Sequence, residues 1–212
     1  RVGDGSEAGS AFVATIAAPL TGTAGLGKTD LGTLILTGAN TYSGGTTVFG
    51  GALQGNTTSL QGPIDVADNA TLLFDQASNG TYTGRLFGTG EVVKQGAGVL
   101  TLTSTQSGNF SGTVRLEQGG LVVNGQQGGA LTTLAGTTLS GSGRVRALDL
   151  SGTLAPGNSI GTLNVTGGAV LRDGSTYQVE LAANGTGDKL LVDGDVTIEG
   201  GTVVLSLLDP ET

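Results

Sequence analysis

The chain has 212 residues, of which 41 are glycine, 9 are basic and 17 are acidic, so its formal charge is −8 at pH 7. It contains no histidine, cysteine, methionine or tryptophan, which excludes a disulfide framework, a thiolate zinc site, a histidine-ligated metal and a Ser-His-Asp triad within the chain. The acidic balance and the scattered basic residues argue against nucleic-acid binding, which depends on clustered Lys and Arg.

The glycine content does not indicate collagen or disorder. Glycine lacks the strict three-residue period of a collagen helix. The chain is 37% hydrophobic, so it has the apolar surface that disordered chains lack. Because the sequence begins at Arg1, we expect a piece of a longer protein whose targeting segment lies elsewhere.

Short alternating segments predict strands in chain order at 33–37, 99–103, 113–117 and 177–181. In the last two, polar and apolar side chains alternate, which is the two-residue period of a strand with one buried face. Gly38 and Ser104 directly follow the first two segments, and the frequent glycine disfavours helices. We therefore expect an all-β protein.

Two of these segments belong to an internal repeat. Residues 28–37 resemble residues 94–103, with Lys28 aligned to Lys94. The similarity continues through 42–53 and 110–121 after a two-residue insertion in a turn. Repeated strand–turn–strand units of about 20 residues predict a β-solenoid, whose coils stack and whose corners need Gly or Asn. An antiparallel sandwich is the alternative.

The pattern changes from about residue 120. Residues 152–165 (GTLAPGNSIGTLNV) form a distinctive segment around Pro156, and 188–194 and 202–208 follow with further apolar stretches. An open solenoid end exposes strand edges that favour aggregation. We therefore expect residues 119–212 to form a C-terminal β cap on coils formed by residues 1–118.

Three segments carry a resemblance to a known family. Residues 32–54 resemble the passenger-associated repeat of bacterial autotransporters, whereas the second copy departs from that repeat at 105–109. Residues 152–165 and 188–207 resemble the autochaperone region of the same proteins. The resemblance implies a right-handed parallel β-helix on the surface of a Gram-negative bacterium.

The resemblance also implies a function. We expect a stalk and autochaperone segment that folds outside the cell, promotes secretion across the outer membrane and displays a distal effector domain. The implied partner is the protein's own C-terminal outer-membrane β-barrel, and the implied location is the cell surface or the medium. Two alternatives stay open: an adhesin whose β-helix surface binds host molecules, and the non-catalytic C-terminal part of a secreted protease or esterase.

One motif suggests catalysis. Residues 157–161 (GNSIG) match the G-x-S-x-G nucleophile elbow of hydrolases. The chain contains no histidine to activate Ser159. We therefore interpret the segment as a turn after Pro156, and we expect no catalytic residue.

Acidic residues suggest two further sites. Asp188, Asp193 and Asp195 are close enough in sequence for calcium, but they lack the spacing of an EF-hand or a calcium-binding β-roll. Polysaccharide-cleaving β-helices use paired carboxylates, and 65–75 holds the densest early acidic group, Asp65, Asp68 and Asp75. Asp is also a common turn residue, so we expect neither metal nor cofactor.

Aromatic residues are few. Tyr42, Tyr82 and Phe110 are candidates for contact with a partner. Because Tyr42 and Phe110 occupy equivalent positions of the repeat, we expect them to pack inside the protein instead.

Overall fold

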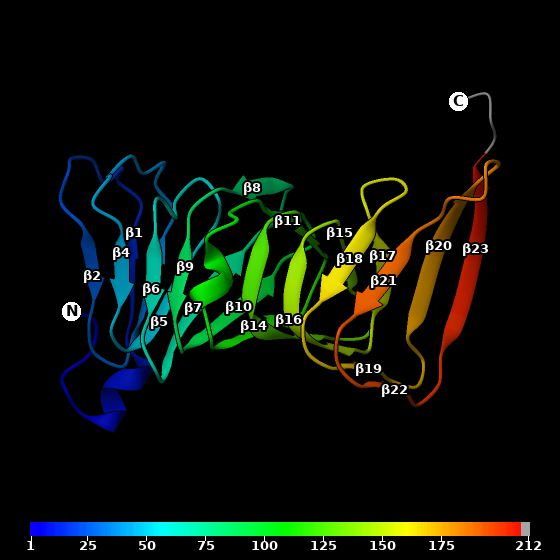
Figure 1. Cartoon of the computed structure of the whole chain (residues 1–212). Helices are drawn as coiled ribbons and strands as arrows, with labels where there is room; N and C mark the ends of the chain where they lie inside the picture. The colour runs from blue at the N-terminus through cyan, green and yellow to red at the C-terminus, as the bar shows by residue number, and fades with distance from the viewer. Residues whose placement is uncertain (209–212) are drawn as a thin grey trace.

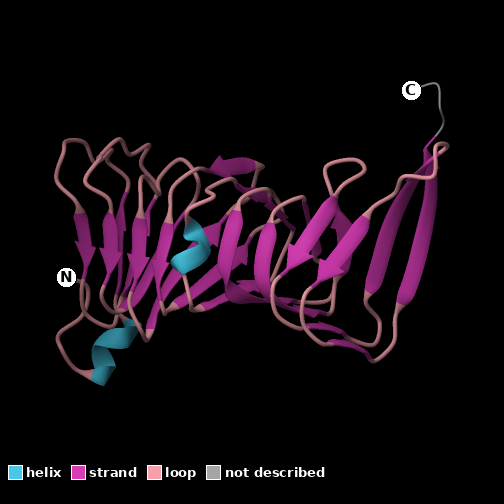
Figure 2. Ribbon diagram, in the orientation of Figure 1, coloured by secondary structure: helices cyan, strands magenta, loops and turns pink. Residues whose placement is uncertain are grey.

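The computed structural model describes residues 1–208, which form one elongated stack of β-strands (Figure 1). The only helices in this range are two short 3-10 turns, η1 (Glu7–Ala11) and η2 (Ser107–Asn109) (Figure 2). No helix of the described part of the chain is long and apolar enough to cross a membrane. The chain is therefore all-β, as predicted.

The strands form three sheets. The long sheet has twelve strands: β1 (Val13–Ile16), β3 (Thr33–Leu36), β5 (Gly51–Gly55), β7 (Ala70–Asp75), β10 (Glu91–Gln95), β12 (Thr113–Leu116), β14 (Gln126–Thr133), β16 (Arg144–Leu150), β18 (Thr162–Val165), β19 (Ala169–Leu171), β21 (Lys189–Val192) and β22 (Val196–Ile198). The seven-stranded sheet has β8 (Gly80–Tyr82), β11 (Val99–Leu102), β13 (Gly120–Val123), β15 (Thr138–Gly141), β17 (Thr153–Pro156), β20 (Thr176–Ala182) and β23 (Thr202–Leu208). The four-stranded sheet has β2 (Leu26–Lys28), β4 (Thr46–Val48), β6 (Ile64–Val66) and β9 (Leu86–Gly88).

Every pair of neighbouring strands in residues 1–208 is parallel, and only two isolated bridges are antiparallel. This excludes the antiparallel sandwich and confirms the β-solenoid. The coil from β7 through β8 and β9 to β10 visits all three sheets in turn. The predicted strands at 33–37, 99–103, 113–117 and 177–181 correspond to β3, β11, β12 and β20.

Two strands of the long sheet, β14 and β16, bend so that each contributes to two sides of the solenoid. β16 pairs with β18 through Arg144 and Val145, but with β19 through Leu148 to Leu150. The register between β14 and β16 shifts after Gln127, as expected where a strand bends. The first part of β14 also lies beside η2, which itself lies beside β9. These first parts therefore continue the side of the solenoid that begins as the four-stranded sheet.

The interior is a stack of apolar side chains in register. Because successive side chains of a strand alternate between its faces, one residue in two points inward. One interior column of the long sheet consists of Leu34, Leu53, Leu72, Val92, Val114, Leu131 and Leu148, all buried. Full burial of one such side chain stabilises the fold by roughly 1.5–3 kcal/mol.

The two copies of the repeat occupy different sides of the solenoid. In the first copy, β3 belongs to the long sheet and β4 to the four-stranded sheet. In the second, the equivalent β11 belongs to the seven-stranded sheet and β12 to the long sheet. Because β8 adds a strand between the copies, the second copy is rotated by one side about the solenoid axis.

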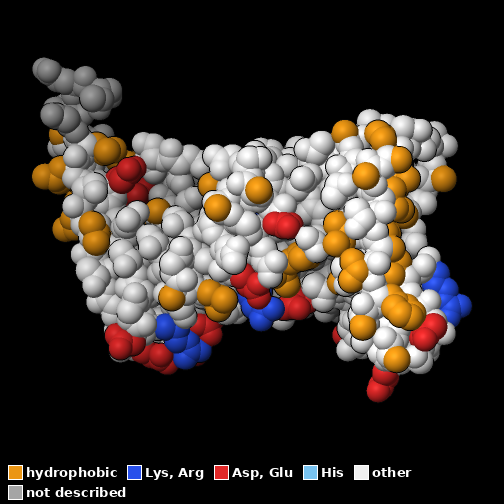
Figure 3. Space-filling view, turned by 180° about the vertical axis from the view of Figure 1, so that it is seen from behind, with side chains coloured by type: hydrophobic (Ala, Val, Ile, Leu, Met, Phe, Trp, Pro, Cys, Tyr) orange, Lys and Arg blue, Asp and Glu red, His pale blue; other side chains and the backbone are white. Residues whose placement is uncertain are grey.

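The C-terminal segment continues the same parallel coils. β20 pairs with β23 over seven residues, and β23 has no second partner among the described residues. One continuous hydrophobic core crosses residues 118 and 119. Side chains of the last coil are exposed, including Leu205 and Leu207, the latter at 82%. Hydrophobic side chains lie at the surface of this end of the molecule (Figure 3).

Candidate functional site

A buried carboxylate holds the distinctive C-terminal turn. Asp188 directly precedes β21 and is 8% exposed. Its Oδ1 accepts a hydrogen bond from the Gly161 N–H at 2.8 Å, and its Oδ2 accepts one from the Glu180 N–H at 2.9 Å. Asp188 therefore ties the turn after β17 to β20, a strand of the next coil.

A second side chain closes the same corner. The Tyr177 hydroxyl accepts a hydrogen bond from the Leu190 N–H at 2.9 Å. Burial raises the pKa of the Tyr177 hydroxyl, against the opposing effect of the hydrogen bond from Leu190. We call Asp188 and Tyr177, with the backbone groups they bind, the C-terminal clamp.

The G-x-S-x-G segment is part of this corner. Gly157 has a φ of +88° and bridges Gly141 on β15. Ser159 lies in a bend between the strands β17 and β18, whereas a nucleophile elbow leads from a strand into a helix. The interpretation of residues 157–161 as a turn is confirmed. A recess of about 390 Å³ beside the turn is lined by polar groups that include Ser140, Asn158 and Glu180.

The candidate calcium ligands have separate surroundings. Both carboxylate oxygens of Asp188 accept hydrogen bonds from backbone N–H groups. Asp193 and Asp195 are exposed, and no group of three acidic side chains in residues 1–208 is arranged to hold a metal ion. The structure therefore assigns Asp188 to the clamp, a role that sequence spacing did not indicate.

The early acidic group is also dispersed. Asp75 accepts a hydrogen bond from Gln54 Nε2 at 3.1 Å, and Asp68 accepts one from the adjacent Asn69. Asn69 has a φ of +60°, so this pair forms the expected turn. Asp65 differs, because its side chain points outward from the middle of β6.

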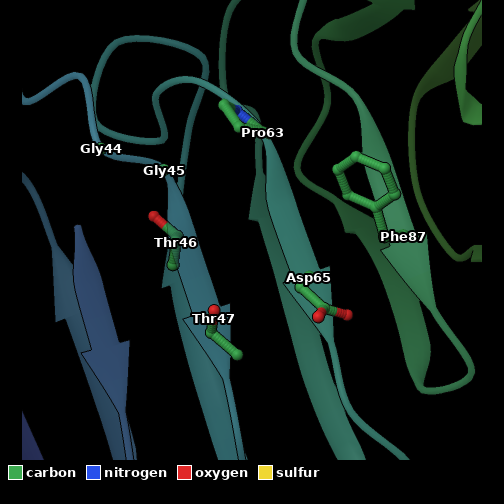
Figure 4. Close-up of a pocket in the computed structure, with 7 residues that line it drawn as sticks. All are labelled: Gly44, Gly45, Thr46, Thr47, Pro63, Asp65 and Phe87. Carbon is green, nitrogen blue, oxygen red and sulfur yellow. The ribbon is translucent and has the colours of Figure 1, made fainter.

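Asp65 lies in a groove on the four-stranded sheet. Thr47, Asp65 and Phe87 are in register on β4, β6 and β9, and they project from the same face (Figure 4). Gly44, Gly45, Thr46 and Pro63 complete the lining of this groove, whose volume is about 340 Å³. We call it the sheet groove.

Sequence reasoning missed Phe87 as part of a surface site. The Arg85 guanidinium carbon lies 4.2 Å from the centre of the Phe87 ring. The alternation of buried Leu86 with its neighbours could have placed Phe87 on the outer face. The stacking of three strands that brings Phe87 beside Asp65 could not be read from the sequence.

The three aromatic candidates are core residues. Tyr42, Tyr82 and Phe110 are all buried, which confirms the packing role predicted for Tyr42 and Phe110 and shows that Tyr82 packs inside as well. The Tyr42 hydroxyl is hydrogen-bonded to Thr46 Oγ1, and the Tyr82 hydroxyl donates to the Gly62 carbonyl, both at 2.6 Å. Their polar ends are therefore satisfied inside the fold.

The two aligned lysines are fully buried. Lys28 Nζ donates to the carbonyls of Thr29, Asp30 and Gly50 at 2.7–3.0 Å. Lys94 Nζ donates to those of Gln95, Gly96 and Gln118 at 2.8–3.0 Å. Burial lowers the pKa of both lysines, against the opposing effects of Asp30 on Lys28 and of Asp75 on Lys94.

Part of the sequence matches a known family. The sequence profile of the Passenger-associated-transport-repeat family matches residues 26–54 and 92–123. These are β2 to β5 and β10 to β13, the two copies that contain the buried lysines. The parallel coils and the duplicated corner therefore define a solenoid of the autotransporter-passenger class.

Relatives support the same assignment. The Adhesin BmaC autotransporter of Brucella suis biovar 1 (strain 1330) is 33% identical over 233 aligned positions, which cover 98% of this chain and 7% of the relative. Two proteins named Extracellular serine protease from Serratia marcescens are 36% and 34% identical over 134 and 130 positions, covering 62% and 60% of this chain and 12% of each relative. The chain spans about a tenth of the length of these relatives. It belongs to the autotransporter passenger domains.

Membership of this family implies a secreted or cell-surface protein.

Proposed function

We propose that this chain is a stalk and autochaperone segment of an autotransporter passenger. It folds outside the cell, promotes passage of the chain across the outer membrane and carries an effector domain away from the surface. Its partner in this process is the protein's own outer-membrane β-barrel. The chain itself contributes no catalysis, and it aligns with 12% of the length of each protease relative.

The C-terminal clamp is the observation that carries this proposal. In a solenoid, stability is approximately the sum of each coil's own stability and its contacts with neighbouring coils. Asp188 adds one charge-assisted hydrogen bond to the preceding coil, at Gly161, and one within its own coil, at Glu180. Residues 119–212 are therefore suited to form first and to template the coils that precede them.

Strand length supports the same direction of folding. β14, β16, β20 and β23 have seven or eight residues each, whereas every strand of the four-stranded sheet has three. Longer parallel strands form more backbone hydrogen bonds per coil. The pairs β14–β16 and β20–β23 are thus longer than any pair of the four-stranded sheet, whereas β17 and β20 between them pair over two residues.

The test compares Asp188→Asn with Asp193→Asn, which makes the same chemical change at an exposed carboxylate. Asp188→Asn should lower the free energy of unfolding by about 2 kcal/mol, because one buried N–H loses its acceptor. If the clamp forms first, this loss should appear mainly as slower refolding, with a φ-value near 1. In the full-length protein, less protease-resistant passenger should reach the cell surface.

A destabilised Asp188→Asn variant that refolds at the wild-type rate would contradict the proposal. Its φ-value would then be near 0, which means that the clamp forms after the rate-limiting step. Normal surface display of that variant would point to the same conclusion. Asp193→Asn should behave like wild type in both measurements.

A second function is favoured by the adhesin relative and by the sheet groove. The relative that aligns with 98% of this chain is named an adhesin. The groove combines an aromatic ring with polar groups on an outer face of the solenoid. We propose that this face also binds molecules of a host surface.

A further inference from the structure

We propose that the sheet groove binds a neutral saccharide ring. This inference deepens the second proposed function and is independent of the first. It depends on three side chains that stand in one row on adjacent strands, Thr47, Asp65 and Phe87. Figure 4 shows them on the same face of β4, β6 and β9.

Phe87 supplies the apolar wall. Its half-buried ring lines the groove on the side of Asp65. The guanidinium of Arg85 lies over the ring, and such a cation–π contact fixes the ring's orientation. An aromatic face held in place suits the C–H face of a sugar, which is apolar, while the hydroxyls project around its edge.

Asp65 and Thr47 supply the polar contacts. No side chain or backbone group of residues 1–208 forms a hydrogen bond or ion pair with the Asp65 carboxylate. The Thr47 hydroxyl on the next strand also has no partner in this range. An ionised carboxylate is an acceptor with two oxygens, so it can receive two neighbouring hydroxyl groups.

The groove has room for one ring. Neighbouring strands lie about 4.8 Å apart, so Thr47 and Phe87, on either side of β6, are about 10 Å apart. The groove has a volume of about 340 Å³, and it is lined by both polar and apolar groups. Ligand sites of this kind combine an apolar surface with a few placed polar groups.

Charge selects among possible ligands. Asp65 and the net charge of −8 disfavour sialylated or sulfated sugars. Arg85 beside Phe87 disfavours a basic peptide at the aromatic ring. On the continuation of the same side, Gln126, Arg144 and Asn164 are in register on β14, β16 and β18, which again offers hydrogen-bonding groups of mixed character.

The experiment titrates the 212-residue chain with galactose, glucose, mannose, N-acetylglucosamine and sialic acid, and follows backbone amide shifts by nuclear magnetic resonance. At least one neutral sugar should shift the amides of Thr47, Asp65 and Phe87 in a saturable manner. Sialic acid should bind at least tenfold more weakly. An acetylated lysine-free peptide and a lysine-rich peptide are titrated in the same way, to test whether the groove binds a peptide instead of a sugar.

Variants locate the site. Phe87→Leu keeps apolar bulk without the ring, and Asp65→Asn keeps the shape without the charge; each should weaken binding about tenfold, which corresponds to about 1.4 kcal/mol. Phe87→Tyr keeps the ring and should retain binding. Phe49→Ala removes another aromatic ring, 60% exposed, and Asp68→Asn another exposed carboxylate, both outside the groove lining, so both should bind like wild type.

Three results would overturn the inference: no saturable shift with any neutral sugar, unchanged binding in both Phe87→Leu and Asp65→Asn, or stronger binding of the lysine-rich peptide than of any sugar. Attachment of cells that display the full-length protein tests the adhesin function separately. If attachment persists in Phe87→Leu and Asp65→Asn, host binding stands but uses another surface.

Discussion

Lys28 and Lys94 form the same set of hydrogen bonds at two different corners of the solenoid. Each ammonium group binds two carbonyls of its own turn and one carbonyl of the following coil. Lys28 lies between the four-stranded and long sheets, whereas Lys94 lies between the long and seven-stranded sheets. The repeat therefore specifies a corner and not a particular side.

Replacing a corner lysine should destabilise the chain. Lys94→Met fills similar space but leaves three carbonyls without their donor, at a cost of about 3 kcal/mol. Lys189→Met, at an exposed site on β21, should cost little. The free energy of unfolding from guanidinium titrations measures both, and equal effects in the two variants would show that the buried ammonium contributes nothing.

The same lysine predicts a pH dependence. Since burial lowers the pKa of Lys94 in the folded state, the unfolded chain binds more protons between that lowered pKa and about 10.4. Stability contributed by this group therefore rises with pH through that window. The rise should be smaller in Lys94→Met when unfolding is measured across the alkaline range.

The glycine that follows the corner should tolerate no side chain. Gly119 has a φ of +69°, and a Cβ atom there would lie 2.5 Å from the Gly96 carbonyl oxygen. Gly119→Ala should cost about 3 kcal/mol through backbone strain and steric overlap. Gly174 has a similar φ of +79° but open space around it, so Gly174→Ala should cost about 1 kcal/mol. Thermal or denaturant unfolding measures the stability loss of each variant. Similar losses in the two variants would show that the positive φ alone accounts for the cost and that steric overlap at Gly119 adds nothing.

Ionisation of the Tyr82 hydroxyl should reduce the stability of the fold at high pH. Burial raises the pKa of its hydroxyl in the folded state, with a smaller contribution from Tyr42. Its contribution to stability is complete below the unfolded pKa of about 10 and is lost as pH rises above that value. Tyr82→Phe should lose about 1 kcal/mol at neutral pH, because the Gly62 carbonyl loses its donor, but should decline less above pH 10. Parallel stability curves for the two proteins would refute this.

The last coil should mediate self-association of the 212-residue chain. β23 pairs only with β20 among the described residues, and Leu205 and Leu207 on it are exposed. Free strand edges with apolar side chains pair with other chains. Sedimentation should show a mass that increases with concentration in wild type and less so in Leu205→Lys. As a control, Leu31→Lys changes an exposed turn residue of the first coils and should leave the concentration dependence of the mass unchanged. A wild-type chain that stays monomeric at all concentrations would exclude this interface.

The fold was predictable because the solenoid repeats its local signals. Alternating segments such as 33–37 predicted individual strands, and the aligned 28–37 and 94–103 predicted stacked coils. The rotation of the second copy was not predictable, because it depends on β8, a three-residue strand that sequence alternation did not distinguish from a turn. Long-range register decides which side a strand joins.

The site residues were less predictable. The turn at 157–161 could be inferred from Pro156 and the absent histidine, but its partner Asp188 lies 27 residues from Gly161. Lys28 and Lys94 appeared as aligned charges, which usually indicates exposure, whereas the corner carbonyls that bind them become visible only in three dimensions. Pairings between distant coils leave no local pattern.

The rotation of the repeat gives its two copies different surroundings. Thr47 of the first copy faces the sheet groove, whereas Arg115, the aligned residue of the second, projects from the long sheet between Glu91 and Glu117. The outer side chains of a duplicated segment therefore lie on a different side of the solenoid from those of the original. Gene duplication in such a solenoid can free a copied position to diverge as soon as it forms, without any change in the corner that folds it.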